Sequence, residues 1–192
     1  SLSFYQKKII LFPGRLTSWK GQEMFIESLN IFKQKNPDKK FYAIILGSEQ
    51  GRKIFKKKIQ RLVEQYRLIN DVIFIENCKN MPLAYKISDI VVSCSIEPEA
   101  FGRVAVEAQA MEKAIVASNI GGSKETIIDN KTGFLFKAGD TMSLSDKLSH
   151  VFELDETTLK SMGNEGRKNV INKFNVEKMC FSTYSEYKKL IS

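Results

Sequence analysis

Continuously apolar segments alternate along this chain with segments whose apolar residues recur every three or four positions. A short run that is apolar throughout is typical of a strand covered on both faces of a parallel sheet, and the second pattern is typical of a helix. Helices are expected between the strands, and only helices after Thr141. We predict strands in residues 7–16, 41–47, 71–75, 89–95, 113–118 and 132–136.

This order of elements predicts an α/β domain of the doubly wound, Rossmann-like type, with a mostly parallel six-stranded sheet, helices on both faces and further helices at the C-terminal end. The 192 residues fit one domain, residues 1–192, whose last predicted helix spans residues 176–191 with Asn175 as its N-cap. The chain begins with Ser1 rather than Met, shortly before a buried strand, so we expect further sequence to precede it in the complete protein.

The composition, 43% apolar and 27% charged, is that of a soluble globular protein. No apolar run reaches the length of about 18 residues that a membrane helix needs, and no signal peptide is visible. Cys78, Cys94 and Cys180 lie far apart, and the single histidine is His150. We therefore predict no metal site, three partly buried thiols and a reducing compartment.

The formal net charge of +8 predicts an anionic partner: nucleic acid, an anionic membrane surface or a phosphorylated small molecule. The charge is densest in residues 51–61, where lysines are interleaved with a helical apolar pattern that includes Phe55, Ile59 and Leu62. We interpret this segment as a surface helix with a solvated basic face, and contact with lipid headgroups is the alternative. No nucleic-acid-binding motif accompanies the charge, so no nucleic acid partner is expected.

In a doubly wound sheet, ligands bind at the carboxyl ends of the strands. The loop after the first predicted strand has neither the glycine spacing of a dinucleotide site nor the Gly-Lys-Ser/Thr ending of a P-loop. It does carry Arg15 and Lys20, which could converge on one anion. A helix predicted to begin near Phe101 would add free N–H groups, and Gly102 would let a ligand approach the backbone. These features predict a diphosphate site.

Two glutamates flank the start of that helix. Glu99 precedes it and Glu107 lies about two turns inside, so a paired acid–base arrangement is not expected. Each is instead suited to accept hydrogen bonds from ligand hydroxyls, as a sugar would offer. The spacing alone also fits a loop charge near the helix dipole for Glu99 and a carboxylate paired with a nearby lysine for Glu107.

Residues 99–127 and 132–136 resemble the Glu-x7-Glu region of retaining glycosyltransferases with the GT-B fold, most closely carbohydrate-active family four, the glycosyl transferases group 1. Residues 12–29 and 43–52 resemble the first strand and loop and the second strand of the same family. The resemblance implies the C-terminal, nucleotide-sugar-binding half of a two-domain enzyme, without its N-terminal acceptor half. The helix at residues 176–191 would cross back toward that half.

The resemblance implies hexosyl transfer, with retention of configuration, from a UDP-, GDP- or ADP-sugar to a glycan or glycolipid, with no metal or other cofactor. This half alone is expected to be inactive, and the protein to be cytoplasmic or peripheral at the inner face of the membrane. Arg15 and Lys20 would hold the diphosphate and stabilise the leaving group, and Glu99 would contact the donor sugar. The implied donor-binding residues are Gly14, Asn77, Met81, Phe101, Gly102, Arg103, Val104 and Glu107, with the ribose at Glu107 and the base near residues 77–81.

Two positions depart from the family pattern. Arg103 stands where the family usually has an apolar residue, so its charge would touch the phosphate or face solvent. Glu112 stands where the family usually has glycine, at a helix end that favours a positive φ. Two other functions remain as alternatives. One is a GT-B-like sugar-nucleotide epimerase, which would need acidic and histidine chemistry in the cleft, whereas His150 falls in a late predicted helix far from the predicted site. The other is a non-catalytic basic binding module.

Overall fold

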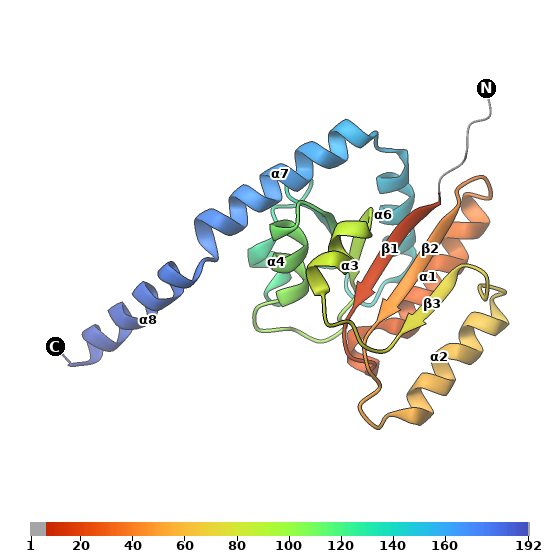
Figure 1. The fold of residues 1–192 in the computed structure, drawn as a ribbon, viewed down its shortest axis with the longest axis horizontal. Helices are drawn as coiled ribbons and strands as arrows, with labels where there is room; N and C mark the ends of the chain where they lie inside the picture. The colour runs from red at the N-terminus through yellow and green to blue at the C-terminus, as the bar shows by residue number, and fades with distance from the viewer. Residues whose placement is uncertain (1–6, 192) are drawn as a thin grey trace.

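The computed structural model describes residues 7–191. Its centre is a six-stranded sheet (Figure 1) in which every neighbouring pair of strands is parallel and the order is β3-β2-β1-β4-β5-β6. This is the order of a doubly wound, Rossmann-like sheet, so the predicted fold class is confirmed. The strands are β1 (Lys8–Pro13), β2 (Phe41–Leu46), β3 (Val72–Ile75), β4 (Ile90–Ser93), β5 (Ala114–Ser118) and β6 (Phe134–Phe136).

Helices cover both faces of the sheet. All six predicted strands and the helices between them are present. From Thr141 onward the described chain forms helices, as predicted. The helices are η1 (Ser18–Lys20, a 3-10 turn), α1 (Gln22–Lys35), α2 (Lys53–Gln65), α3 (Met81–Ile87), α4 (Arg103–Ala110), α5 (Ser123–Thr126), α6 (Thr141–Glu153), α7 (Glu156–Lys173) and α8 (Val176–Ile191).

The sheet separates two hydrophobic cores, because successive strand residues point to opposite faces. In β1, Ile10 and Phe12 belong to the first core, which also contains buried residues of α1, α2 and α6. Leu11, between them, belongs to the second core together with Tyr85 of α3 and Ala108 of α4. Burial on both faces explains why β1 is continuously apolar after Lys8 rather than alternating.

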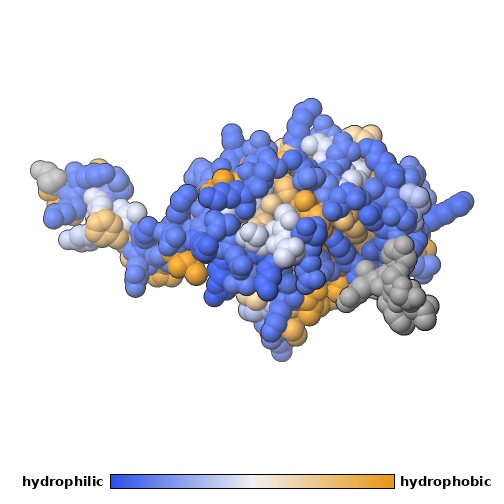
Figure 2. All heavy atoms as spheres, turned by 90° about the horizontal axis from the view of Figure 1, so that it is seen from above, coloured by the Kyte–Doolittle hydropathy of each residue, from blue (hydrophilic) through white to orange (hydrophobic). Residues whose placement is uncertain are grey.

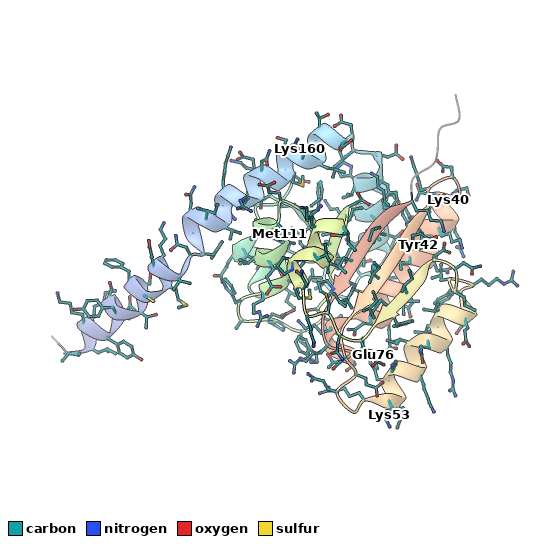
Figure 3. The ribbon with its side chains drawn as sticks, in the orientation of Figure 1. Lys40, Tyr42, Lys53, Glu76, Met111 and Lys160 are labelled. Atoms are coloured by element: carbon teal, nitrogen blue, oxygen red, sulfur yellow. The ribbon has the colours of Figure 1, made fainter. Side chains whose placement is uncertain are left out.

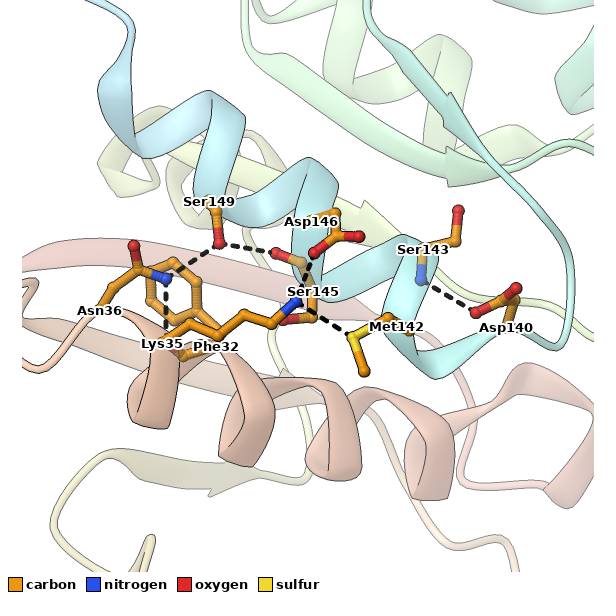
Figure 4. Close-up of polar contacts among 9 residues, drawn as sticks. All are labelled: Phe32, Lys35, Asn36, Asp140, Met142, Ser143, Ser145, Asp146 and Ser149. Atoms are coloured by element: carbon orange, nitrogen blue, oxygen red, sulfur yellow. Dashed lines mark hydrogen bonds and ion pairs between the residues drawn. The ribbon is translucent and has the colours of Figure 1, made fainter.

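Polar contacts join α1 to α6 at the edge of the first core (Figure 4). The Lys35 ammonium lies 2.6 Å from the Asp146 carboxylate, and the Asn36 side chain donates to the Ser149 hydroxyl at 2.9 Å. Asp140 caps α6 by accepting from the Ser143 N–H at 2.9 Å. The Lys35 and Asn36 contacts fix α6 to the C-terminal end of α1 on the face of the sheet that carries the first core.

The end of α4 is built around Glu112, one of the two departures from the family pattern. Glu112 has a φ of 58°, the left-handed conformation that glycine adopts most cheaply. Helix α7 packs closely on this turn: a Cβ at Gly163 would lie 2.1 Å from the Glu112 carbonyl oxygen. Arg167 also donates to the Ala110 carbonyl at 2.6 Å, so α7 satisfies a carbonyl that the helix end leaves free.

Helix α8 projects away from the sheet (Figures 1 and 2) and has no buried residue. Asn175 accepts from the Lys178 N–H at 2.8 Å, which confirms it as the N-cap. Apolar side chains on this helix are largely exposed, among them Met179 at 62%, Phe181 at 72% and Leu190 at 83%.

We predict that Gly21→Ala destabilises the fold far more than Gly51→Ala. Both glycines have a similar positive φ, 79° and 83°, so the two variants share the backbone strain of about 1 kcal/mol. A Cβ at Gly21 would lie 2.1 Å from the Cys94 carbonyl oxygen, whereas a Cβ at Gly51 would have no neighbour within 4 Å. Urea denaturation should give a loss of at least about 3 kcal/mol for Gly21→Ala. Equal losses for both variants would contradict the close approach.

Candidate functional site

The candidate site lies at the carboxyl edge of the sheet, where the strand order reverses between β1 and β4. These strands are neighbours, with Ile10 paired to Ile90 and Leu11 to Val91, so the segments that follow them emerge side by side. The Ile96 N–H donates to the Trp19 carbonyl at 2.8 Å, joining the two segments directly. Figure 3 shows this edge at Glu76 and Lys53, with Lys40 at the opposite edge.

Lys20 and Glu99 meet at this edge. The Lys20 ammonium lies 2.7 Å from Glu99 Oε1, and the two side chains are only 12% and 20% exposed. The buried Ser95 hydroxyl donates to the same carboxylate oxygen. The Lys20 stem passes Gly14, since a Cβ at Gly14 would lie 3.7 Å from Lys20 Cδ. Three of the predicted site residues, Gly14, Lys20 and Glu99, are therefore brought together.

Arg15 is placed differently from Lys20. Its side chain is exposed, and no hydrogen bond or ion pair within residues 7–191 holds its guanidinium. Its backbone carbonyl accepts from the Gln22 side chain at 2.8 Å, which fixes the backbone but not the charge. The predicted convergence of Arg15 and Lys20 on one anion therefore stays a prediction.

Helix α4 begins at Arg103, two residues later than expected. Gly102 is its N-cap, buried and with a φ of 72°. Phe101 precedes the helix and places its ring against Phe174, with centroids 5.7 Å apart. The first N–H groups of the helix, from Arg103 and the half-buried Val104, have no intrahelical acceptor and so remain suited to an anion.

The backbone from Glu99 to Phe101 packs directly against two glycines, Gly121 and Gly122. The Gly122 N–H donates to the Glu99 carbonyl at 2.7 Å. A Cβ at Gly121 would lie 2.5 Å from the Glu99 carbonyl oxygen, and one at Gly122 would lie 2.5 Å from the Phe101 carbonyl oxygen. These glycines are what allow the Glu99 loop to lie directly on the segment after β5.

Glu107 faces a different set of partners. It lies about one turn inside α4 rather than two, because the helix begins at Arg103. Its Oε2 accepts from the Tyr85 hydroxyl at 2.7 Å, and its Oε1 lies 3.2 Å from the Arg103 guanidinium. Arg103 is 83% exposed. The partner of Glu107 on its own helix is thus Arg103 rather than a lysine, and Arg103 is turned toward a carboxylate.

The predicted base-binding segment follows β3. Asn77 is exposed, and Met81 is half-buried as the first residue of α3, packed against the second core. Asn80 caps α3 by accepting from the Leu83 N–H at 3.1 Å. Val104 of α4 packs against the same core, so Met81 and the start of α4 lie on the same face of the sheet.

Burial alters two ionisable groups near the site. Burial first, and then the hydrogen bond to Glu107, raises the pKa of the Tyr85 phenol well above its ordinary value of 10.0, so the phenol remains a hydrogen-bond donor. Burial also raises the pKa of the Cys94 thiol. The prediction of three partly buried thiols was right only for Cys78, since Cys94 is fully buried and Cys180 is exposed.

Among residues 7–191, no group of three or more His, Cys, Asp and Glu side chains is arranged to hold a metal ion. In the same part of the chain, no helix is long and apolar enough to cross a bilayer.

Some lysines of the basic helix α2 form ion pairs with acidic residues: Lys56 lies 3.4 Å from Glu49, and Lys58 pairs with Glu23. Part of its basic face is therefore neutralised within the fold.

The sequence did not identify two residues of the site, Ser95 and Tyr85. Each is a buried hydroxyl that donates to one of the two glutamates. One signal pointed to Tyr85: it lies four residues after Met81, so the two side chains share a face of α3. Ser95 carried the weaker signal of following β4 at the expected ligand-binding edge.

The fold and the strand-end site define a Rossmann-like domain of the kind that forms the C-terminal half of GT-B glycosyltransferases. The chain belongs to the family of glycosyl transferases group 1, which it matches over residues 1–169. It is 31% identical over 185 residues to the D-inositol 3-phosphate glycosyltransferase of Paenarthrobacter aurescens, covering 95% of this chain and 44% of that protein. The chain thus spans about half the length of this relative.

Solved structures show the same similarity. A glycosyltransferase from Rickettsia africae superposes with a TM-score of 0.90 at 35% identity, covering 97% of this chain and 48% of that one. The HepE protein of Anabaena, in complex with UDP-glucose, superposes with a TM-score of 0.86 at 25% identity, covering 96% of this chain and 49% of that one. Both similarities extend over nearly all of this chain and about half of the other protein.

We predict a specific alkaline effect of Tyr85 on stability. In the unfolded chain the phenol ionises near its ordinary pKa of 10.0, whereas in the folded chain it keeps its proton to higher pH. Above about pH 10 the folded state binds more protons than the unfolded state. The free energy of unfolding therefore falls by about 1.4 kcal/mol per pH unit through this group, until the folded phenol also ionises. Urea denaturation should show a constant difference between the parent chain and Tyr85→Phe from about pH 7 to about pH 9.

Above about pH 10 the parent chain should lose stability relative to Tyr85→Phe, since the phenylalanine cannot ionise. Other titrating groups, including Lys8 and Lys113, are common to both proteins and cancel in the difference. A difference that stays constant through about pH 11 would show that the folded phenol ionises as easily as the unfolded one.

Proposed function

We propose that this chain is the donor-binding half of a retaining glycosyltransferase. It binds a nucleoside diphosphate sugar and, with an N-terminal half, transfers the sugar to a glycan or glycolipid acceptor with retention of anomeric configuration. The observation that carries the proposal is the Lys20–Glu99 pair, 2.7 Å apart, at the switch point of the sheet beside the N-terminus of α4. A cation, a carboxylate and free amides together suit a ligand that carries both phosphates and hydroxyls.

The diphosphate is assigned to Lys20, Arg15 and the first N–H groups of α4. Lys20 is largely buried and already faces a carboxylate, so it sits where an anion is stabilised more strongly than at an exposed surface. Arg15 is exposed and its guanidinium can turn toward the same oxygens. When the sugar–phosphate bond breaks, these groups stabilise the charge that develops on the leaving diphosphate.

The sugar and the nucleoside are assigned to opposite sides of the diphosphate. Glu99 accepts from hydroxyls of the donor sugar once Lys20 turns to the phosphates, because an ionised carboxylate can only accept. Glu107 accepts from the ribose, and Asn77 and Met81 border the base. The UDP-glucose complex of HepE supports this class of ligand for a chain with the same fold.

The acceptor and the remaining active-site groups are assigned to the N-terminal half. The exposed apolar side chains of α8, such as Phe181 and Leu190, suit contact with that half. We also propose a cytoplasmic location, with the unneutralised lysines of α2 facing an anionic membrane surface. The epimerase alternative would need a histidine in the cleft. The single histidine, His150, is an exposed residue in the last turn of α6, with its ring against that of Phe134, so it gives this alternative no support.

We expect Lys20→Ala to weaken binding of nucleoside diphosphates by roughly tenfold or more, since it removes a charge-assisted hydrogen bond to phosphate. Arg15→Ala should act in the same direction. Isothermal titration of the 192-residue chain with UDP, GDP and ADP measures both. Lys57→Ala, an exposed lysine on α2, changes the net charge equally and should bind like the parent chain. If both site variants match this control, the phosphate assignment is wrong.

We expect the 192-residue chain to bind a sugar nucleotide without transferring the sugar, because the acceptor half is lacking. The complete protein should transfer it, and proton NMR of the first product should show the anomeric configuration of the donor. Turnover by residues 1–192 alone would contradict the division of labour between the halves. A product of the opposite configuration would contradict retention.

A further inference from the structure

Tyr85 and Glu107 form a contact between two helices that cover the same face of the sheet. Tyr85 comes from α3 and Glu107 from α4 (Figure 1), and the phenol donates to Glu107 Oε2 at 2.7 Å. The Tyr85 side chain is 2% exposed and belongs to the second core together with Leu11 and Ala108. A ring packed in this way has few available rotamers, so its hydroxyl is a fixed point.

The two oxygens of Glu107 are held unequally. Oε2 has the buried Tyr85 hydroxyl, whereas the partner of Oε1 is Arg103, which is 83% exposed and lies 3.2 Å away. An exposed pair of this type contributes little and exchanges readily with solvent or ligand. Oε1 is therefore the oxygen that a ligand can reach, and Oε2 is the oxygen that sets the direction of the carboxylate.

We propose that Tyr85 is a positioning residue for the nucleoside part of the donor. Its hydroxyl fixes the Glu107 carboxylate so that Oε1 is presented to the ribose hydroxyls, and it does so without touching the ligand. The inference rests on the proposed function, since it takes Glu107 as the ribose acceptor. An acceptor that is oriented in advance pays less entropy when the ligand binds.

The position of Tyr85 on α3 extends this role. Tyr85 lies four residues after Met81, the residue assigned to the base, so the two side chains lie on one face of the helix. The Ser88 hydroxyl donates to the Tyr85 carbonyl at 2.7 Å and the Asn80 cap holds the other end of α3, which keeps this short helix rigid. One helix thus sets both the base contact and the direction of the ribose acceptor.

The test compares ribose discrimination in the parent chain and in Tyr85→Phe. Isothermal titration is performed with whichever of UDP, GDP or ADP the chain binds, and with its 2′,3′-dideoxy analogue. The dissociation constant of the dideoxy analogue, divided by that of the nucleoside diphosphate, reports the contribution of the ribose hydroxyls alone. We expect Tyr85→Phe to lower this ratio by about fivefold to tenfold while the dissociation constant of the dideoxy analogue stays unchanged. Tyr66→Phe is the control: Tyr66 follows the last residue of α2 and is partly buried against the first core, so this variant should keep the parent ratio.

A double-mutant cycle with Glu107→Gln separates positioning from packing. If Tyr85 acts through Glu107, the double variant should discriminate no less than Glu107→Gln alone. A merely structural role for Tyr85 would weaken both nucleotides equally and leave the ratio unchanged, which would overturn this inference but not the proposed function. Failure of the parent chain to bind any nucleoside diphosphate would instead contradict the proposed function and, with it, the role of Glu107.

Discussion

The candidate site depends on a backbone contact between the segment after β1 and the segment after β4. Gly21 approaches Cys94 so closely that a Cβ would lie 2.1 Å from its carbonyl oxygen, and the Ile96 N–H donates to the Trp19 carbonyl at 2.8 Å. Lys20 lies between Trp19 and Gly21, the two residues of the segment after β1 that make these contacts. These contacts fix the backbone at Lys20 close to the segment that carries Glu99, which brings the Lys20 ammonium within reach of the Glu99 carboxylate, 2.7 Å away.

Glu99 and Glu107 have the same kinds of partner, but the partners differ in how far they are exposed to solvent. Each accepts from a buried hydroxyl, Ser95 for Glu99 and Tyr85 for Glu107, and each faces a cation. Lys20 is 12% exposed and Arg103 is 83% exposed, so solvent screens the Lys20–Glu99 pair less than the Arg103–Glu107 pair. The sugar end of the proposed ligand thus meets a largely buried ion pair, and the ribose end meets a carboxylate with one exposed partner.

The strands and the general place of the site were predictable, because burial on both faces produces continuous apolar runs and because ligand-binding loops follow neighbouring strands. Lys20 and Glu99 could be assigned to one edge on that basis. The roles of Tyr85 and Ser95 were not predicted: the Tyr85 hydroxyl meets a carboxylate of another helix, 22 residues along the chain, and Ser95 lies in the same loop as Glu99 but in no motif that marks a contact with it. The start of α4 was misplaced by two residues because Gly102, with its φ of 72°, caps the helix instead of opening it.

Under the proposed function, the Lys20–Glu99 pair couples the two ends of the donor site. A diphosphate carries more negative charge than one carboxylate, so it draws Lys20 away and leaves Glu99, 20% exposed, without its cation. A sugar supplies hydroxyls that donate to the freed carboxylate, whereas a nucleoside diphosphate without a sugar supplies none. The intact donor therefore supplies a partner for both Lys20 and Glu99, whereas the nucleoside diphosphate alone supplies a partner only for Lys20.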